Sequence, residues 1–206
     1  MKIAVLDYGI GNLRSAQKAL ERVGADARLT ADLLEIDAAD AVVLPGVGAF
    51  GSCMEALRRS ELDHAALSAI GAGRPFLGVC IGMQMLYASS QENPEAEGLG
   101  VFDRAVRLLP PGVKRPQMQW NRLHLVDSAH PMFTGLDEAW VYFVHSYAAE
   151  PGDEVVATCD YGMDVVAAVA RDNVWATQFH PEKSGAVGLA ILANFTRWAT
   201  RSGAVS

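Results

Sequence analysis

The sequence predicts an α/β fold with a mostly parallel central sheet, flanking helices and antiparallel additions in the C-terminal half. Two patterns indicate this fold class. Over residues 1–90, short apolar runs alternate with apolar residues at helical spacing, which is typical of parallel sheets covered by helices. In the second half, strand-like segments follow one another with few helices between them, which favours antiparallel pairing.

The first half contains short apolar runs that predict buried strands, separated by segments with helical spacing. We expect strands at Lys2–Asp7, Asp40–Leu44 and Phe76–Val79. We expect helices from Leu13 to a stop at Gly24, and over Gly51–Arg59, Leu62–Ala72 and Met83–Ala88.

The second half is rich in β-branched and aromatic residues in short runs. These runs predict strands at Val101–Leu108, Trp120–Val126, Trp140–Val144, Val155–Cys159, Asp164–Ala170 and Val174–Phe179. A final helix is expected over Ala186–Thr200, and polar or proline-rich loops over Gln91–Gly98 and Leu109–Met118.

Composition narrows the class of protein. The 206 residues show no break in composition, so we expect one domain over residues 1–206, and 50% hydrophobic residues predict a large core. A net charge of −7 argues against a nucleic-acid role. No apolar run is long enough for a membrane span, and the N-terminus resembles a strand rather than a signal peptide. Three cysteines do not form a disulfide framework, which favours the cytoplasm.

The segment Gly78-Val79-Cys80-Ile81-Gly82 has the layout of a nucleophile elbow, with cysteine at the nucleophile position. A strand precedes Cys80 and a helix is expected behind it, so the helix dipole would favour the thiolate. The flanking glycines leave room for the sharp turn. Cys53 and Cys159 lie in ordinary helical and strand patterns, and we interpret both as buried structural residues.

A matching base follows the last predicted strand, at His180-Pro181-Glu182. In extended chain, residues i and i+2 project to the same side, so Glu182 can orient the imidazole of His180. Together with Cys80 these residues supply a nucleophile, a base and an orienting group. Acyl transfer also requires oxyanion donors, and we expect the backbone N–H groups of Ile81 and Val47 to serve, although Pro-Gly-Val-Gly also fits an ordinary tight turn.

The other histidines carry weaker signals. We expect His64, His124 and His130 to face solvent, whereas His145 has equal grounds for lining the site or lying outside it. The sequence shows no set of residues at metal-ligand spacing, so no metal is expected. Gly9-x-Gly11 lacks the rest of a dinucleotide-binding motif and is discounted.

Taken together, these segments resemble those of the class I glutamine amidotransferases, and the match runs from one end of the chain to the other. The matching segments are Asp7-Tyr8-Gly9-x-Gly11-Asn12, Pro45-Gly46-Val47-Gly48-Ala49-Phe50, Gly78-x-Cys80-x-Gly82-Met83-Gln84, Trp120-Asn121, Tyr142-Phe143-Val144-His145-Ser146-Tyr147 and Phe179-His180-Pro181-Glu182-Lys183-Ser184.

The resemblance implies a catalytic triad of Cys80, His180 and Glu182 that hydrolyses glutamine through a thioester, without a cofactor. It also implies substrate-binding residues, which are Gly48, Gln84, His145 and Ser146. Within the family, the segments at residues 45–50 and 142–147 indicate the branch that supplies ammonia for histidine biosynthesis.

In that branch the resemblance implies a heterodimer with a (β/α)8-barrel cyclase subunit. The positions implied at the interface are Asn12, Trp120, Tyr142 and Lys183. The chain departs from the family pattern at Gln119 and at Asp103-Arg104, where glycine is usual. Gln119 leaves open the geometry of the interface loop.

Other functions compete with this interpretation. The same catalytic residues would serve an amidotransferase for anthranilate or pyridoxal phosphate synthesis, although Pro-Gly-Val-Gly-Ala-Phe argues against those branches. A non-catalytic cysteine sensor or chaperone would keep the elbow but would not need His-Pro-Glu. A thiol peptidase is disfavoured by the small pocket that Gln84 implies.

Overall fold

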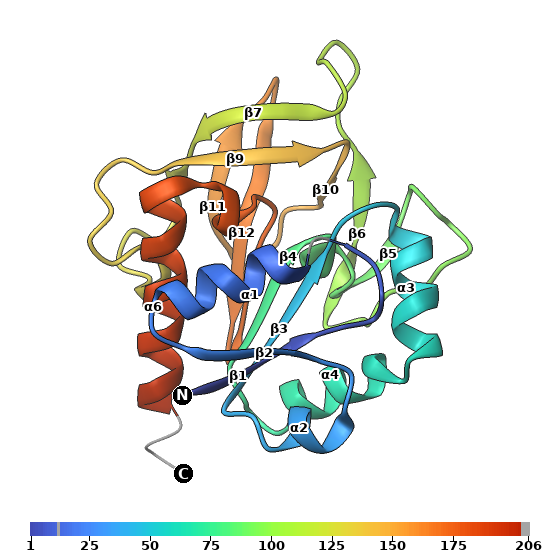
Figure 1. The fold of residues 1–206 in the computed structure, drawn as a ribbon. Helices are drawn as coiled ribbons and strands as arrows, with labels where there is room; N and C mark the ends of the chain where they lie inside the picture. Colours follow the sequence, from blue (N-terminus) through green and yellow to red (C-terminus); the bar gives the residue numbers. More distant parts are fainter. Residues whose placement is uncertain (12, 203–206) are drawn as a thin grey trace.

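The computed structural model describes residues 1–11 and 13–202, and its centre is an eight-stranded sheet (Figure 1). The strands are β1 (Lys2–Leu6), β2 (Asp26–Thr30), β3 (Ala41–Gly46), β4 (Phe76–Cys80), β5 (Tyr87–Ser90), β6 (Phe102–Leu108), β7 (Gln117–Arg122), β8 (His124–Leu125), β9 (Trp140–His145), β10 (Tyr147–Ala149), β11 (Val155–Asp160), β12 (Asp164–Arg171) and β13 (Val174–Thr177).

The strand order in the large sheet is β2-β1-β3-β4-β13-β12-β11-β8. The pairs from β2 through β13 are parallel, and the pairs from β13 through β8 are antiparallel. The predicted fold class, a mostly parallel sheet with antiparallel additions from the second half, is therefore confirmed.

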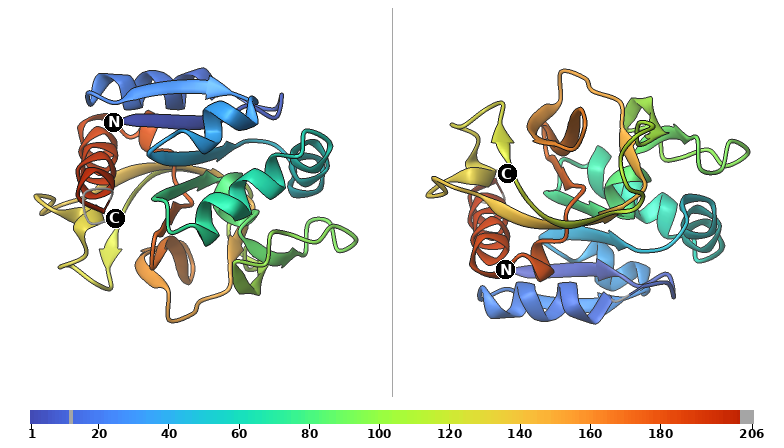
Figure 2. Two further views of the ribbon diagram at one scale, coloured as in Figure 1. Left: turned by 90° about the horizontal axis from the view of Figure 1, so that it is seen from below. Right: turned by 90° about the horizontal axis from the view of Figure 1, so that it is seen from above.

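Helices cover both faces of this sheet, as the end-on views in Figure 2 show. The helices are α1 (Leu13–Arg22), α2 (Leu33–Asp37), α3 (Phe50–Arg59), α4 (Leu62–Gly71), α5 (Ile81–Gln84) and α6 (Gly185–Ser202), with short 3-10 turns η1 (Pro131–Phe133) and η2 (Pro181–Lys183). Helices α1 and α6 contact each other on one face, and α4 packs against both α2 and α3 on the other. None of the helices in this described part of the chain has the length and hydropathy needed to span a membrane.

Two smaller sheets complete the fold. Strands β10, β6 and β5 form one of them. Strands β7 and β9 pair as an antiparallel ribbon, which crosses the upper end of the molecule in Figure 1. Residues on β9 alternate between exposed or half-buried and buried, so one face of the ribbon packs inward and the other faces out.

The expectation of a helix over Met83–Ala88 is wrong. Helix α5 ends at Gln84, and the chain enters strand β5 at Tyr87. The ring of Tyr87 packs 5.1 Å from that of Phe102, and the backbones of the two residues pair between β5 and β6. Sheet pairing therefore overrides the helical spacing of the apolar residues.

Other element boundaries in the structure also differ from those expected from the sequence. The segment Trp120–Val126 divides between β7 and β8, and the last strand ends at Thr177, before the expected Phe179. Strands β2 and β10 and helix α2 were not expected. Strand β2 lies at the sheet edge, where alternating exposed residues such as Asp26 and Arg28 hide its apolar pattern.

The backbone of α5 lies very close to the backbone of β3 where the helix crosses the end of that strand. A Cβ atom added to Gly82 would lie 1.8 Å from the carbonyl oxygen of Leu44, and one added to Gly78 would lie 2.9 Å from the oxygen of Gly82. The turn between β4 and α5 therefore requires glycine on both sides of Cys80.

We predict that Gly82→Ala lowers the free energy of unfolding by about 3 kcal/mol or more, because backbone rather than a flexible side chain must move. Gly71→Ala is the matched control, since a Cβ atom there meets no heavy atom within 4 Å, and we expect a change within about 0.5 kcal/mol. Denaturant unfolding of the two variants measures the difference, and equal stabilities would contradict the packing argument.

Candidate active site

Cys80 is the last residue of β4 and directly precedes α5, at the carboxyl edge of the parallel strands. Its backbone φ of 56° and ψ of −111° is a conformation that residues with side chains rarely adopt. Such strain persists only where the surrounding structure enforces it, and it is typical of nucleophile elbows. The side chain is buried but lines a cavity.

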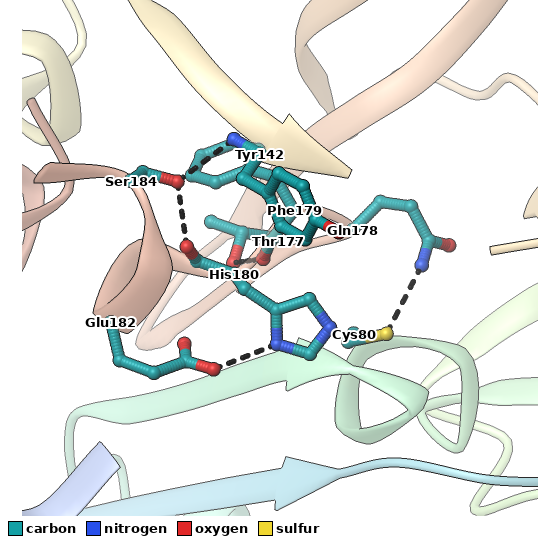
Figure 3. A network of polar contacts seen from close by, with 8 residues as sticks. All are labelled: Cys80, Tyr142, Thr177, Gln178, Phe179, His180, Glu182 and Ser184. Carbon is teal, nitrogen blue, oxygen red and sulfur yellow. Dashed lines mark hydrogen bonds and ion pairs between the residues drawn. The ribbon is translucent and has the colours of Figure 1, made fainter. Parts of the chain in front are cut away.

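His180 and Glu182 follow β13, the neighbour of β4. The Nδ1 atom of His180 lies 2.8 Å from Oε1 of Glu182, and the ring faces Cys80 (Figure 3). The three side chains predicted as nucleophile, base and orienting group are therefore gathered at one sheet edge.

A set of hydrogen bonds fixes the backbone around His180. The hydroxyl of Ser184 donates to the carbonyl of His180 at 2.6 Å, and accepts from the N–H of Tyr142 at 3.0 Å (Figure 3). The N–H of His180 donates to the carbonyl of Tyr142 at 3.0 Å. The backbone of His180, the predicted base, is therefore bonded to strand β9 of the ribbon.

Burial would lower the pKa of His180, but the adjacent Cys80 and the hydrogen bond to Glu182 outweigh it and raise the pKa to about 9. His180 is therefore protonated at neutral pH. Because this pKa lies above the ordinary value of 6.5, the stabilisation from the pair is complete below about pH 6.5 and is lost as the pH rises through about 9.

The loop at the end of β3, residues 46–48, which we call the oxyanion loop after its predicted role, borders the same cavity. Val47, Gly48 and Ile81 all line it beside Cys80. Two buried donors hold the loop from beneath: the hydroxyl of Tyr8 donates to the carbonyl of Pro45 at 2.7 Å, and the thiol of Cys53 to the carbonyl of Val47 at 3.4 Å.

The cavity has a volume of about 390 Å³, which suits a ligand the size of an amino acid. Its lining includes all of the predicted substrate residues and others that the sequence did not suggest. The lining residues are Val47, Gly48, Cys80, Ile81, Gln84, Glu92, Pro116, Val144, His145, Ser146, Tyr147, His180 and Lys183.

Two unpaired acceptors belong to this lining. The Nε2 atom of Gln84 donates to the carbonyl of Tyr147 at 2.9 Å, and Nδ1 of His145 lies 2.8 Å from the same oxygen. Burial lowers the pKa of His145 to about 4, so its ring is neutral, with the proton on Nδ1. Oε1 of Gln84 and Nε2 of His145 are left buried without a protein partner among the described residues.

The site also contains Gln178, which sequence reasoning missed. This fully buried residue lies 3.7 Å from the sulfur of Cys80 through its Nε2 atom (Figure 3). A glutamine at the end of an apolar strand gives no sequence signal of its own. Only its position two residues before His180 could have drawn notice.

The remaining cysteines and histidines lie mostly where expected. Cys53 and Cys159 are buried in α3 and β11, and burial raises the pKa of each thiol to about 11. His64 and His124 are exposed. The expectation for His130 is wrong: it is half-buried, with its ring 5.1 Å from that of Trp175. Among the described residues, no group of His, Cys, Asp and Glu could hold a metal ion.

Two of the predicted interface residues lie close to the triad: Tyr142 bonds to the backbone of His180, and Lys183 lines the same cavity. Trp120 and Tyr142 are direct partners across β7 and β9, with ring centroids 6.2 Å apart, and Lys183 is exposed in η2. Asn12 lies outside the described residues. Exposed apolar or aromatic side chains dominate the outer face of the ribbon, at Met118, Trp120 and Trp140.

Comparison with known proteins gives a consistent picture. The family description "Glutamine amidotransferase class-I" matches residues 4–198. A protein of Methanothermobacter thermautotrophicus named imidazole glycerol phosphate synthase subunit HisH is 50% identical over 94% of this chain and 96% of its own length. A protein of the same name from Acinetobacter baylyi is 46% identical over 96% and 98%.

Solved structures share the fold at low identity. PurLQS from Thermotoga maritima superposes with a TM-score of 0.76 at 20% identity, covering 96% of this chain and 98% of that one. A structure described as a glutamine amidotransferase gives 0.74 at 21% identity, covering 98% of both chains. These similarities support the fold.

We predict that the pKa values of the two buried histidines are displaced in opposite directions from the ordinary value of 6.5. NMR of the imidazole C–H protons should show His180 protonated at neutral pH with a midpoint near 9, and His145 neutral down to about pH 4. Glu182→Gln should lower the His180 midpoint, because the carboxylate favours the imidazolium. An unchanged midpoint in that variant would show that Glu182 does not set the charge.

Proposed function

Because the chain belongs to the class I glutamine amidotransferase family, we propose that its cavity is the glutaminase site of an imidazole glycerol phosphate synthase. The chain hydrolyses glutamine in histidine biosynthesis. We assign this activity to one domain spanning residues 1–206. The observation that carries the assignment is the meeting of Cys80, His180 and Glu182 at one sheet edge beside a cavity of amino-acid size.

The first chemical step is attack by Cys80. The sulfur adds to the side-chain amide carbon of glutamine, and the new negative charge on oxygen is held by the N–H groups of Val47 and Ile81. His180, charged at neutral pH, gives its proton to the departing ammonia, while Glu182 keeps the ring aligned. The product is a thioester on Cys80.

Hydrolysis of the thioester restores the enzyme. Neutral His180 now takes a proton from water, which attacks the acyl carbon, and the bond to sulfur breaks to release glutamate. His180 thus returns to its charged form. No step requires a cofactor or a metal.

The cavity lining supplies groups for the amino-acid end of glutamine. The unpaired acceptors on Gln84 and His145 suit the α-ammonium group, and the carboxylate of Glu92 adds negative charge to the same lining. Backbone at Gly48 and Ser146 borders the cavity on other sides and suits the α-carboxylate. A buried acceptor without a hydrogen-bond partner costs free energy, and an ammonium group can donate hydrogen bonds to acceptors of this kind.

The names of the relatives imply a partner subunit. We propose a (β/α)8-barrel cyclase that docks on the outer face of the β7–β9 ribbon and forms a heterodimer. Its ammonia acceptor would be a formimino-aminoimidazole carboxamide nucleotide, which yields imidazole glycerol phosphate and an aminoimidazole carboxamide ribotide. Trp120, Tyr142 and Lys183 would lie at that contact, since large apolar side chains on a ribbon face are typical of an interface core.

A reducing compartment such as the cytoplasm suits this chemistry, because Cys80 must remain a free thiol. Anthranilate and pyridoxal phosphate synthesis would require the same triad. Relatives at 46–50% identity named for imidazole glycerol phosphate synthase favour histidine biosynthesis.

We predict that Cys80→Ala abolishes glutamate release from glutamine, with a loss of several orders of magnitude, because it removes the nucleophile. Cys53→Ser and Cys159→Ser are matched controls, since both cysteines are buried and free. Serine at position 53 can still donate to the carbonyl of Val47. Glutaminase activity in Cys80→Ala equal to that of the parent would refute the assignment.

We also predict that the isolated chain hydrolyses glutamine slowly and that the cyclase with its nucleotide accelerates it by about 10²–10³, the worth of one oxyanion donor. The reason is that Gly48, at a φ of 106°, gives the oxyanion loop freedom to rotate a peptide. Steady-state glutamate release is measured for the chain alone, with partner, and with partner and nucleotide. Trp120→Ala should reduce the stimulation and leave basal turnover unchanged, and equal turnover in all three mixtures would refute gating by the partner.

A further inference from the structure

A continuous series of polar contacts runs from the substrate cavity to the nucleophile. The Nε2 atom of Gln84 donates both to the carbonyl of Tyr147 and to Oε1 of Gln178, each at 2.9 Å. Nε2 of Gln178 then lies 3.7 Å from the sulfur of Cys80 (Figure 3). Both glutamine side chains are buried, so these contacts are shielded from water.

The direction of each amide in this series is fixed by chemistry. The carbonyl of Tyr147 can only accept, so Gln84 must present its NH₂ group there. The same NH₂ group faces Gln178, which must therefore present its oxygen to Gln84. The NH₂ group of Gln178 is left facing Cys80. A backbone carbonyl more than sixty positions along the chain from Cys80 thus determines that the nucleophile meets a donor.

This donor has a role that the elbow alone does not fill. The sequence suggested that a helix dipole would stabilise the thiolate, but α5 has only four residues and few aligned peptides to sum. Cys80 is 2% exposed, so water gives little help. An N–H group directed at the sulfur favours the charged form of the thiol.

We propose that Gln178 is a positioning residue that holds the sulfur of Cys80 and stabilises its thiolate, with its amide oriented by Gln84. This inference rests on the proposed function only in taking Cys80 as the nucleophile.

The chain contains a matched contact away from the site. Gln117 is fully buried, and its Nε2 atom lies 3.7 Å from the sulfur of Cys159. Burial raises the pKa of Cys159 to about 11, and the Gln117 contact acts against that rise. Gln117 and Cys159 are the same pair of groups at the same distance. Substitution of Gln117 therefore controls for the loss of a buried amide that does not contact Cys80.

The test measures the reactivity of Cys80 directly. Gln178→Met keeps the length of the side chain and removes the donor, and Gln178→Glu keeps the oxygen that accepts from Gln84 and replaces the donor with a second oxygen. Iodoacetamide labelling of the Cys80 peptide is followed by mass spectrometry between pH 5 and 10 in each variant, in Gln117→Met and in the parent. Thermal unfolding of each protein is recorded alongside.

We expect the labelling midpoint of Cys80 to rise by about one pH unit in Gln178→Met, which would slow labelling about tenfold at any pH below both midpoints. The shift should be larger in Gln178→Glu, where a carboxylate faces the sulfur, and kcat should fall in both variants. Gln117→Met should leave the Cys80 midpoint unchanged. A parent-like midpoint in either folded Gln178 variant would overturn the proposal.

The outcomes also separate the two proposals. If Cys80→Ala loses glutaminase activity while both Gln178 variants label like the parent, only the role of Gln178 fails. If Cys80→Ala keeps its activity, the proposed function fails whatever the labelling shows. Should Gln178→Met unfold, Gln178→Glu decides, because it preserves the shape and the hydrogen bond from Gln84.

Discussion

The close packing of the α5 turn against the end of β3 is the constraint on which the site depends. Because Gly82 lies against the carbonyl of Leu44, the chain must leave β4 by a sharp turn that holds Cys80 at a φ of 56°. Register then places Gly46 of β3 beside Cys80, and β13 brings His180 to the same edge from the other side. The proposed nucleophile, oxyanion loop and base converge because three parallel strands end together.

The triad is also connected to the outer surface by short hydrogen bonds. Ser184 joins the carbonyl of His180 to the N–H of Tyr142, and Tyr142 pairs across the ribbon with exposed Trp120. A protein seated on the outer face of the ribbon would therefore touch an element bonded directly to His180, the proposed catalytic base. Tight packing transmits such displacements, since close-packed interiors yield little. The ribbon is at once the candidate docking face and the support of His180.

Sequence reasoning worked where chemistry and periodicity agreed. Strands β1, β3 and β4 are continuous apolar runs, and the segments Gly-x-Cys-x-Gly and His-Pro-Glu lie at one edge of the sheet that these runs predict. It failed where tertiary contacts decide. Tyr87 extends a helical pattern, yet it pairs with β6, and β2 is an edge strand with polar residues. Gln178 escaped notice because its role depends on Gln84 and Tyr147, which are distant in sequence.

The two buried histidines show how local partners assign chemical roles within one cavity. The Nδ1 atom of His145 pairs with the neutral carbonyl of Tyr147, so burial, helped by the nearby charge of His180, dominates and its pKa falls to about 4. His180 meets the carboxylate of Glu182 and the sulfur of Cys80, so its pKa rises to about 9 despite similar burial. Environments that separate the pKa values of two titratable groups suit them to different roles. A neutral ring that accepts from a ligand and a charged ring that gives a proton can therefore border one substrate.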